Sequence, residues 1–594
     1  RQAVLDQDVE GKGLPSEDKL WMKNYRVGDF KWNNEQMSPY DRLISSNIDW
    51  LDEQAMEFFG KKFTYKQFFD EVDKLAEKME SAGIKKGTRI PVVLVNTPES
   101  FITLYALYKV KATIAPIFPL EKADKFKEKI DRINHINAEN GIISNYMFVS
   151  DFVLGNIKSA IPTYEKVIVL PVSNSMPAPL ALAFKHVVMP KFGIKPLKYD
   201  EQYISYCDFI GEKRKDLEKE EEYYKEYVKN IKQGYDNSYT AVQLYTGRTI
   251  KAKGVNLSEE NIDSAAKQFY NDRFDFRRGD KIAAFMPLNH SFGLIIGTHV
   301  AASLGVNLDV IMKIDFKKIY KYFLKDKVNI FGGIPNMFTN ILNSKEFEGK
   351  DLSHVKYLLS GGAAIDKQIQ DDSTNFFKEH NSTAEVHDGY GQTESAGGII
   401  YDGIPNMNTL VKVVEPGTIN EAGYEEPGEL CISGPQIMQG YDDTELNADA
   451  LRVHEDGRIW LHTGDGAIIH KDGVIQYIDR LDRMIKVNGE QVYLNHIEEE
   501  INTLPFVDRC AVVKRSDDVR GNVPVAFIKL KPNVVWSEEF DRIINNFYKE
   551  KFNSSSKPRE TTYIDELPVT GVGKIDFKTL EKLANEKYQQ QKAR

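Results

Sequence analysis

Short apolar runs alternate with amphipathic stretches early in this 594-residue chain, and this alternation restricts the possible folds most. In residues 68–76 and 101–109 the apolar side chains recur at helical spacing, and Thr64 stands where a helix cap is expected. Residues 90–95 and 113–117 are short apolar runs, typical of parallel strands that are buried on both faces. The alternation therefore predicts an α/β fold whose parallel sheets are covered by helices.

The length and charge of the chain exclude several other classes. A chain of 594 residues exceeds one ordinary core, so two or more domains are expected. Its formal net charge of -10 disfavours nucleic-acid partners, because phosphate backbones attract basic faces. Cys207, Cys431 and Cys510 are too widely spaced for a zinc or disulfide pattern, which favours a reducing cytoplasm. No run approaches the roughly 20 apolar residues that a membrane span needs.

One glycine-rich segment carries the clearest chemistry. Gly389 and Gly391 flank Tyr390, and Thr393 and Glu394 follow directly. Glycine lets the backbone approach a ligand closely, and a tyrosine ring offers a flat face for a purine. The hydroxyl and the carboxylate offer hard oxygen ligands for Mg²⁺ beside a phosphate group. Taken alone, the segment is also compatible with an ordinary surface loop.

Five further motifs surround this segment in a fixed order, namely residues 287–293, 360–364, 463–465, 479–483 and 567–574. The ordered series resembles the adenylate-forming superfamily of acyl-CoA synthetases, nonribosomal peptide adenylation domains and luciferases. It extends over roughly residues 50–580 and is most similar to bacterial acyl-CoA ligases.

The resemblance implies a large N-terminal AMP-binding domain and a small hinged α+β lid domain. The large domain would comprise residues 37–481, after an N-terminal extension of residues 1–36, and the lid would comprise residues 482–594. A change of composition marks residues 171–235 as an insertion in the large domain. The Lys-, Glu- and Tyr-rich part of this insertion, residues 211–234, predicts a solvated helix.

Residues 244–255 match the phosphate loop of the family, where backbone amides and hydroxyls converge on the triphosphate. Ile250 and Ala252 replace the usual Gly and Pro, and Arg248 replaces a Thr. Because a β-branched residue resists the positive φ that glycine permits, we expect a stiffer or differently closed loop. The residues expected to contact ATP here are Thr246, Gly247, Arg248, Thr249 and Lys253.

The resemblance assigns the remaining nucleotide contacts and the catalytic residues. The adenine and ribose side of the site would be formed by Gly361, Gly362, Ala363, Asp388, Gly389, Tyr390, Gly391, Asp465 and Arg480. The catalytic set would be Thr393, Glu394, His290 and Lys574, with Glu394 as the Mg²⁺ ligand. His290 would border the acyl pocket, although a lone histidine is usually structural. Asp482 would be the hinge, and Gly489 would line the CoA channel.

The implied reaction is ATP-dependent activation of a carboxylic acid to acyl-AMP, followed by thioester formation with CoA. The resemblance implies that the acid is a fatty acid. ATP, Mg²⁺ and CoA are the expected cofactors. Two alternatives remain open. The chain could load a carrier protein instead of free CoA, or it could be a catalytically weakened nucleotide-binding homologue, given Arg248 and Ile250.

An apolar patch opens the insertion at residues 177–189 and is interleaved with, and followed by, lysines. It is too short to span a bilayer. It is compatible with a position on a membrane surface, but an ordinary packed insertion is the more common structure for such a patch. The lysines are Lys185, Lys191, Lys195 and Lys198.

Overall fold

The computed structural model describes residues 13–25, 35–163, 165–195, 197–211, 220–246, 253–269, 274–487, 490–517, 520–532, 534–569 and 575–592. These residues form two compact units. Unit 1 consists of Trp21–Leu410 and Ile432–Leu461, and unit 2 contains the described parts of residues 13–20, Val411–Cys431 and His462–Arg594. The predicted boundary after residue 481, at the expected hinge, lies within unit 2 and stays a prediction.

The larger sheet of unit 1 has nine strands in the part of the chain that the structure describes, in the order β16-β15-β14-β13-β12-β10-β11-β1-β2. The strands from β14 through β1 pair in parallel, and the edge strands are antiparallel. The bounds are β1 (Gln54–Phe58), β2 (Lys61–Thr64), β10 (Lys281–Ala284), β11 (Asn307–Val310), β12 (Ile330–Gly333), β13 (Tyr357–Gly361), β14 (Val386–Gln392), β15 (Gly397–Tyr401) and β16 (Ile404–Pro405). The parallel centre confirms the predicted α/β class.

A second sheet of unit 1 has eight strands among the described residues, in the order β19-β9-β8-β4-β3-β5-β6-β7. It is parallel from β8 through β7, whereas β9 and β19 are antiparallel additions at one edge. Its strands are β3 (Arg89–Val93), β4 (Thr113–Pro116), β5 (Tyr146–Ser150), β6 (Lys166–Leu170), β7 (Tyr203–Ser205), β8 (Val242–Thr246), β9 (Lys253–Leu257) and β19 (Gly440–Tyr441).

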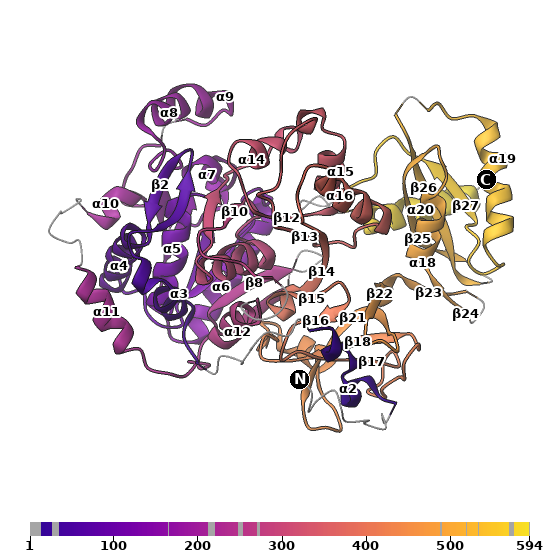
Figure 1. Cartoon of the computed structure of the whole chain (residues 1–594), viewed down its shortest axis with the longest axis horizontal. Coiled ribbons are helices and arrows are strands. Elements are labelled where there is room, and N and C mark those ends of the chain that lie inside the picture. The colour runs from indigo at the N-terminus through magenta and orange to yellow at the C-terminus, as the bar shows by residue number, and fades with distance from the viewer. Residues whose placement is uncertain are drawn as a thin grey trace. The chain divides into compact units, whose positions relative to one another are not determined.

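Helices lie between the strands in chain order, as Figure 1 shows for unit 1. They include α3 (Pro39–Asn47), α4 (Tyr65–Ser81), α5 (Pro98–Lys109), α6 (Ala123–Glu139), α7 (Asp151–Ile157), α12 (Glu259–Phe269), η6 (Phe292–Val300), α13 (Ala301–Ser303), α14 (Tyr320–Leu324), α15 (Pro335–Leu342), α16 (Lys367–Glu379) and α17 (Asn447–Ala450). The expected cap of α4 is confirmed, because the Thr64 hydroxyl accepts from the amide of Gln67 and the Gln67 side chain caps Thr64 in return. Apolar residues of α4 and α5 share one core with β3, the strand between them.

The insertion begins with a continuous helical stretch made of α8 (Ala178–Ala183), η4 (Phe184–Val188) and α9 (Met189–Lys191). Helices α10 (Tyr206–Ile210) and α11 (Glu221–Lys229) follow. The prediction of a solvated helix is wrong for the inner face of α11. Tyr224 is fully buried there, and its hydroxyl donates to Asp70 of α4 at 2.6 Å.

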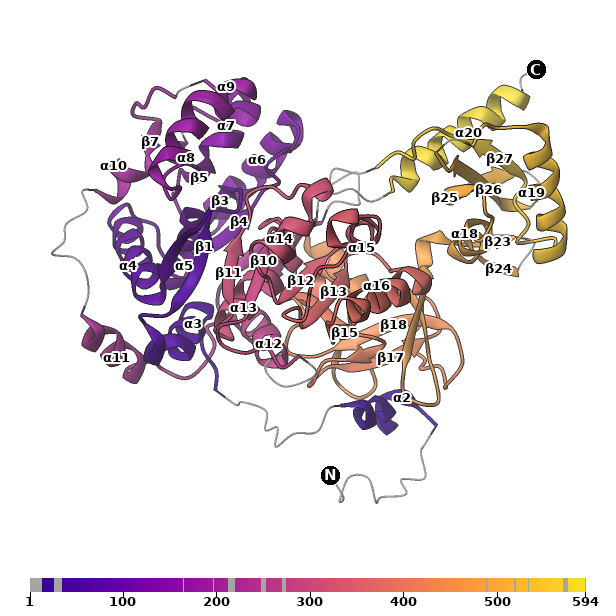
Figure 2. The same ribbon diagram turned by 45° about the horizontal axis from the view of Figure 1, so that its top comes forward.

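The C-terminal part of unit 2 is a small α+β domain, as predicted (Figure 2). Its sheet has the order β24-β23-β26-β25, with β27 paired to β26. The elements are β23 (Met484–Val487), β24 (Glu490–Tyr493), α18 (Leu494–Asn502), β25 (Val507–Asp517), β26 (Gly521–Leu530), α19 (Glu538–Lys551), β27 (Glu560–Tyr563) and α20 (Phe577–Lys592).

A further sheet precedes this domain in the chain, with the order β17-β18-β21-β20 and β22 paired to β21. Its strands are β17 (Leu410–Val414), β18 (Gly428–Ser433), β20 (Leu451–Val453), β21 (Ile459–Ile469) and β22 (Ile475–Arg480). No helix among the described residues combines the length and the apolar character that crossing a membrane requires.

Candidate active site

Two of the predicted nucleotide motifs lie side by side at the carboxyl ends of parallel strands. Ser360 pairs with Asp388, and Gly361 pairs with Gly389, where β13 and the parallel part of its pairing with β14 end. Gly362 follows with a φ of 79°, which favours glycine. Ligands of open α/β sheets bind at this end of the strands. The structure thus brings together the residues predicted to contact adenine.

The turn between β14 and β15 explains the glycines of the central segment. A Cβ on Gly391 would overlap the carbonyl oxygen of Gly397, and Ala396 adopts the left-handed conformation with a φ of 55°. The Ser395 hydroxyl accepts from the amide of Gln392 at 3.0 Å, which closes the turn. A tight turn of this shape presents the residues at its tip, Thr393 and Glu394, in one conformation.

The carboxylate of Glu394 is tied to the phosphate-loop strand through Tyr441. The Tyr441 hydroxyl donates to Oε1 of Glu394 at 2.9 Å, and the Nζ atom of Lys253 lies 5.0 Å from the centre of the Tyr441 ring. Among the described side chains, Tyr441 is the donor that reaches this carboxylate. Glu394 and Thr393 offer hard oxygens next to a cationic side chain, a donor set that suits Mg²⁺ bound to phosphate.

The phosphate loop connects the antiparallel strands β8 and β9. Thr246 and Lys253 pair with each other at the end of these strands from which the loop leaves. The predicted contacts Gly247, Arg248 and Thr249 lie outside the described residues, as do Ile250 and Ala252. Strand β9, which begins at the C-terminal end of the loop, lies beside the Glu394 turn.

A buried carboxylate clamps the C-terminal end of this loop. Asp442 is bound in a two-pronged pair by Arg132 of α6, with Nε–Oδ2 and Nη2–Oδ1 distances of 2.6 and 2.7 Å. The backbone amide of Gly254 donates to Oδ1 at 2.9 Å, and Gln243 Nε2 donates to Oδ2 at 3.1 Å. A Cβ at Gly254 would overlap the carboxylate, so the close approach requires glycine. Sequence reasoning missed this clamp because Arg132 and Asp442 are 310 residues apart.

We expect Arg132→Met to raise the KM for ATP about 10-fold, because a hydrogen bond to a charged group contributes roughly 1.5–3 kcal/mol. Loss of the guanidinium loosens Asp442 and with it the end of the phosphate loop. Steady-state kinetics at varied ATP measure the effect. Lys125→Met, which removes an exposed lysine from the same helix, is the matched control. An unchanged KM in folded Arg132→Met would show that the clamp does not position the loop.

Asp388 and His290, two further predicted site residues, each make a hydrogen bond to a different partner. The amide of Asp388 donates to Oδ1 of Asp402 at 2.9 Å, and burial, with the nearby Asp402, raises the pKa of Asp388 to about 6. His290 precedes η6, and its Nδ1 accepts from the amide of Phe292 at 3.2 Å. This local bond orients the imidazole, in keeping with a structural role or with a position at the border of the acyl pocket.

Two predicted ribose or phosphate contacts meet in unit 2. Asp465 of β21 pairs in register with Arg480 of β22, and the Arg480 Nη1 atom lies 3.0 Å from Oδ1 of Asp465. The amide of Gly464 donates to Glu429 at 3.0 Å. The ion pair holds a carboxylate and a guanidinium together, so both are oriented before a ligand arrives.

A buried network lies beside the predicted hinge residue Asp482. Arg483 contacts Glu498 at 2.6 Å and Asp479 at 3.5 Å, and its guanidinium lies 3.9 Å from the centre of the Phe577 ring. The network ties the start of the C-terminal domain to α18 and α20. Gly489 and Lys574 lie outside the described residues.

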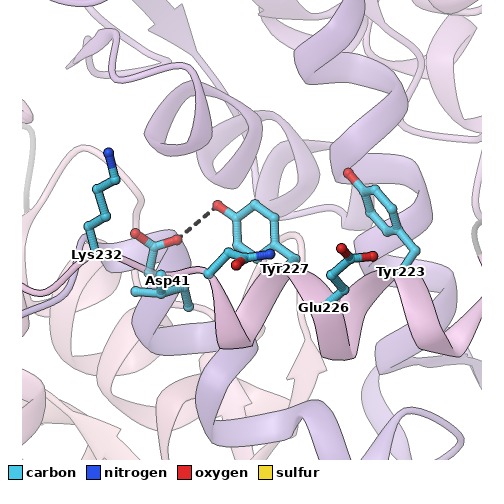
Figure 3. A pocket seen from close by; sticks show the side chains of 7 residues that line it. Asp41, Tyr223, Glu226, Tyr227 and Lys232 are labelled. Carbon is cyan, nitrogen blue, oxygen red and sulfur yellow. Dashed lines mark hydrogen bonds between the residues drawn. The ribbon is translucent and has the colours of Figure 1, made fainter.

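A surface pocket of about 360 Å³ in unit 1 lies apart from these motifs in the sequence (Figure 3). It is formed by residues of α3 and α11 and the segment after α11, and the hydroxyl of Tyr227 donates to Asp41 across it at 2.8 Å. None of its lining residues belongs to the predicted nucleotide site. The lining residues are Asp41, Tyr223, Glu226, Tyr227, Asn230, Ile231 and Lys232.

Comparison with known proteins agrees with the predicted resemblance. The chain is 25% identical over 548 residues to a long-chain-fatty-acid–CoA ligase of Bacillus subtilis (strain 168), covering 90% of this chain and 92% of that protein. It is 24% identical over 575 residues to a long-chain-fatty-acid–CoA ligase of Escherichia coli O6:H1, covering 94% and 97%. These similarities confirm the predicted enzyme class, an acid–thiol ligase.

A solved structure confirms the fold. The crystal structure of an anthranilate CoA ligase in complex with anthranoyl-AMP is similar, with a TM-score of 0.75 at 20% identity, covering 94% of this chain and 99% of that one. Residues 49–442 match the AMP-binding enzyme family, and residues 496–574 match the AMP-binding enzyme C-terminal domain. The chain belongs to the AMP-binding enzyme family.

Proposed function

We propose that this enzyme converts a fatty acid, ATP and CoA into acyl-CoA, AMP and pyrophosphate. The observation that carries the proposal is the link from Lys253 through Tyr441 to Glu394, which joins the phosphate loop to a carboxylate suited to Mg²⁺. The names of the similar bacterial proteins support a long-chain fatty acid as the substrate class. Because the reaction consumes ATP and CoA, both abundant in the cytoplasm, we propose a cytoplasmic location.

In the first step a carboxylate oxygen of the acid attacks the α-phosphorus of ATP, and pyrophosphate leaves with the electrons of the broken P–O bond. Two anions must approach, so positive charge and donors have to be positioned in advance. Lys253 and the amides of the phosphate loop would hold the triphosphate, and Lys574 would bridge the carboxylate and the α-phosphate. Thr393 and Glu394 would hold Mg²⁺, which neutralises phosphate charge when it is bound.

In the second step the CoA thiolate attacks the acyl carbon, and AMP leaves as a good leaving group. We propose that the C-terminal domain rotates about Asp482 between the steps, which withdraws Lys574 and brings Gly489 to the CoA channel. Hinges are a few residues that absorb backbone rotation. The Arg483 network lies directly beside the proposed hinge residue, Asp482. This part of the proposal rests on the family motifs.

Pyrophosphate release separates this function from the two alternatives. The assay uses a panel of straight-chain acids of increasing length, with and without free CoA. Acyl-CoA formation in proportion to ATP consumed supports the proposed ligase. Adenylate formation that ignores free CoA would instead favour loading of a carrier protein. ATP binding without pyrophosphate release for any acid would identify a catalytically weakened homologue.

We expect Ile250→Gly to raise the turnover number modestly if the altered phosphate loop limits the rate. Glycine permits the positive φ that a β-branched residue resists. The turnover number of pyrophosphate release at saturating ATP measures the effect. An unchanged or lower turnover number in the variant would show instead that the loop is adapted to isoleucine.

A further inference from the structure

The helical stretch α8-η4-α9 exposes apolar side chains on its outer face. Its inner face packs on the core of unit 1 through Phe184, which is buried, and through Ala181 and Val188. On the outer side, Leu182 and Val187 remain 60% and 49% exposed. Exposed apolar side chains gathered on one surface mark a site of contact with a protein or a membrane. The outer face of this stretch therefore suits an apolar partner.

The charge of the same segment is opposite to that of the whole chain. Residues 177–199 contain four lysines and no Asp or Glu, whereas the chain has a net charge of -10. Phe192, directly after α9, is 59% exposed, and Lys313 from another segment lies 5.8 Å from the centre of its ring. The half-buried carboxyl of Asp151 faces Lys185, but it already accepts a hydrogen bond from the amide of Val172.

We propose that α8-η4-α9 and Phe192 dock on the surface of an anionic lipid bilayer. The apolar side chains would enter the boundary between head groups and acyl chains. The lysines beside them would contact lipid phosphates. Figure 1 shows α8 and α9 at the edge of unit 1. A self-complementary contact between two copies is disfavoured, because it would bring the four lysines of each copy together.

Vesicle co-sedimentation tests the proposal without ATP or acid, so its outcome is independent of the proposed function. We expect the wild-type protein to bind vesicles of phosphatidylcholine with phosphatidylglycerol more tightly than vesicles of phosphatidylcholine alone. Binding should weaken as salt is raised. Lys191→Gln with Lys195→Gln should lower the partition coefficient on the order of 25-fold, about 5-fold for each lysine.

Leu182→Glu with Val187→Glu should abolish binding to the anionic vesicles. The matched control is Ile143→Glu with Val535→Glu, which changes two exposed apolar residues outside the segment and should bind like wild type. Both variants should melt at the temperature of the wild type, because the substituted side chains are exposed.

Three results would overturn the proposal. The first is absence of binding to anionic vesicles. The second is an equal loss of vesicle binding in the Leu182→Glu, Val187→Glu variant and in its control with Ile143→Glu and Val535→Glu. The third is a dimer in light scattering that Leu182→Glu dissociates. The last result would assign the surface to a second copy of the chain.

Discussion

Glu394→Gln is expected to lower the rate of pyrophosphate release on the order of 10²–10³-fold, the effect of losing one preorganised charge-stabilising group. The amide keeps the size of the side chain, and its oxygen still accepts from Tyr441, so the turn between β14 and β15 should persist. What is lost is the negative charge that would hold Mg²⁺. Pyrophosphate release across a Mg²⁺ titration measures the effect, and partial recovery at high Mg²⁺ is expected.

Tyr441→Phe is the matched control, because it keeps the ring beside Lys253 and removes only the hydroxyl that donates to Glu394. A hydrogen bond to a charged group contributes roughly 1.5–3 kcal/mol, so a loss of about 10-fold is expected. If Glu394→Gln kept the wild-type rate and Mg²⁺ dependence, the metal would have to be held by other residues.

Lys574→Ala is expected to slow acyl-adenylate formation by a similar factor, on the order of 10²–10³. The lysine would neutralise charge between the carboxylate and the α-phosphate in the first step only. Thioester formation from preformed acyl-AMP should therefore stay near the wild-type rate. Single-turnover measurements of the two half-reactions separate these effects.

Lys578→Ala provides the comparison for Lys574, since it removes an exposed lysine from the start of α20, four residues further along the chain. It should leave both half-reactions unchanged. Near-normal adenylate formation in Lys574→Ala would remove this lysine from the mechanism. Equal losses in both half-reactions would point to a general defect of the C-terminal domain instead.

Local patterns predicted the helices and strands that are marked by a cap or by regular spacing of apolar residues. Thr64 and the apolar spacing after it identified α4, and the apolar run before Pro98 identified β3. The pattern failed for α11, because its many charged residues hide one tyrosine. Tyr224 is buried through a hydrogen bond to Asp70, a partner 154 residues away that no local pattern reveals.

In the candidate site, too, motifs in the sequence could be predicted but contacts between distant residues could not. Motif order predicts Tyr390 and Glu394 as site residues, and the pairing of β13 with β14 brings two of the predicted motifs side by side. The residues that support the motifs were not predicted. Tyr441 reaches Glu394 from 47 residues away, and Arg132 reaches Asp442 across 310 residues. Neither contact follows from local periodicity, since both depend on how distant strands and helices are brought together.

The clamp on Gly254 also bears on the order in which the protein is made. Asp442 is synthesised 188 residues after the glycine whose amide it holds. A ribosome adds roughly 5–20 residues per second, so the interval lasts on the order of ten seconds or more. Until then the second parallel sheet lacks its last edge strand, and the phosphate loop lacks the carboxylate that anchors it. Incomplete chains released before this point should therefore bind ATP poorly, which would keep unfinished copies from consuming nucleotide.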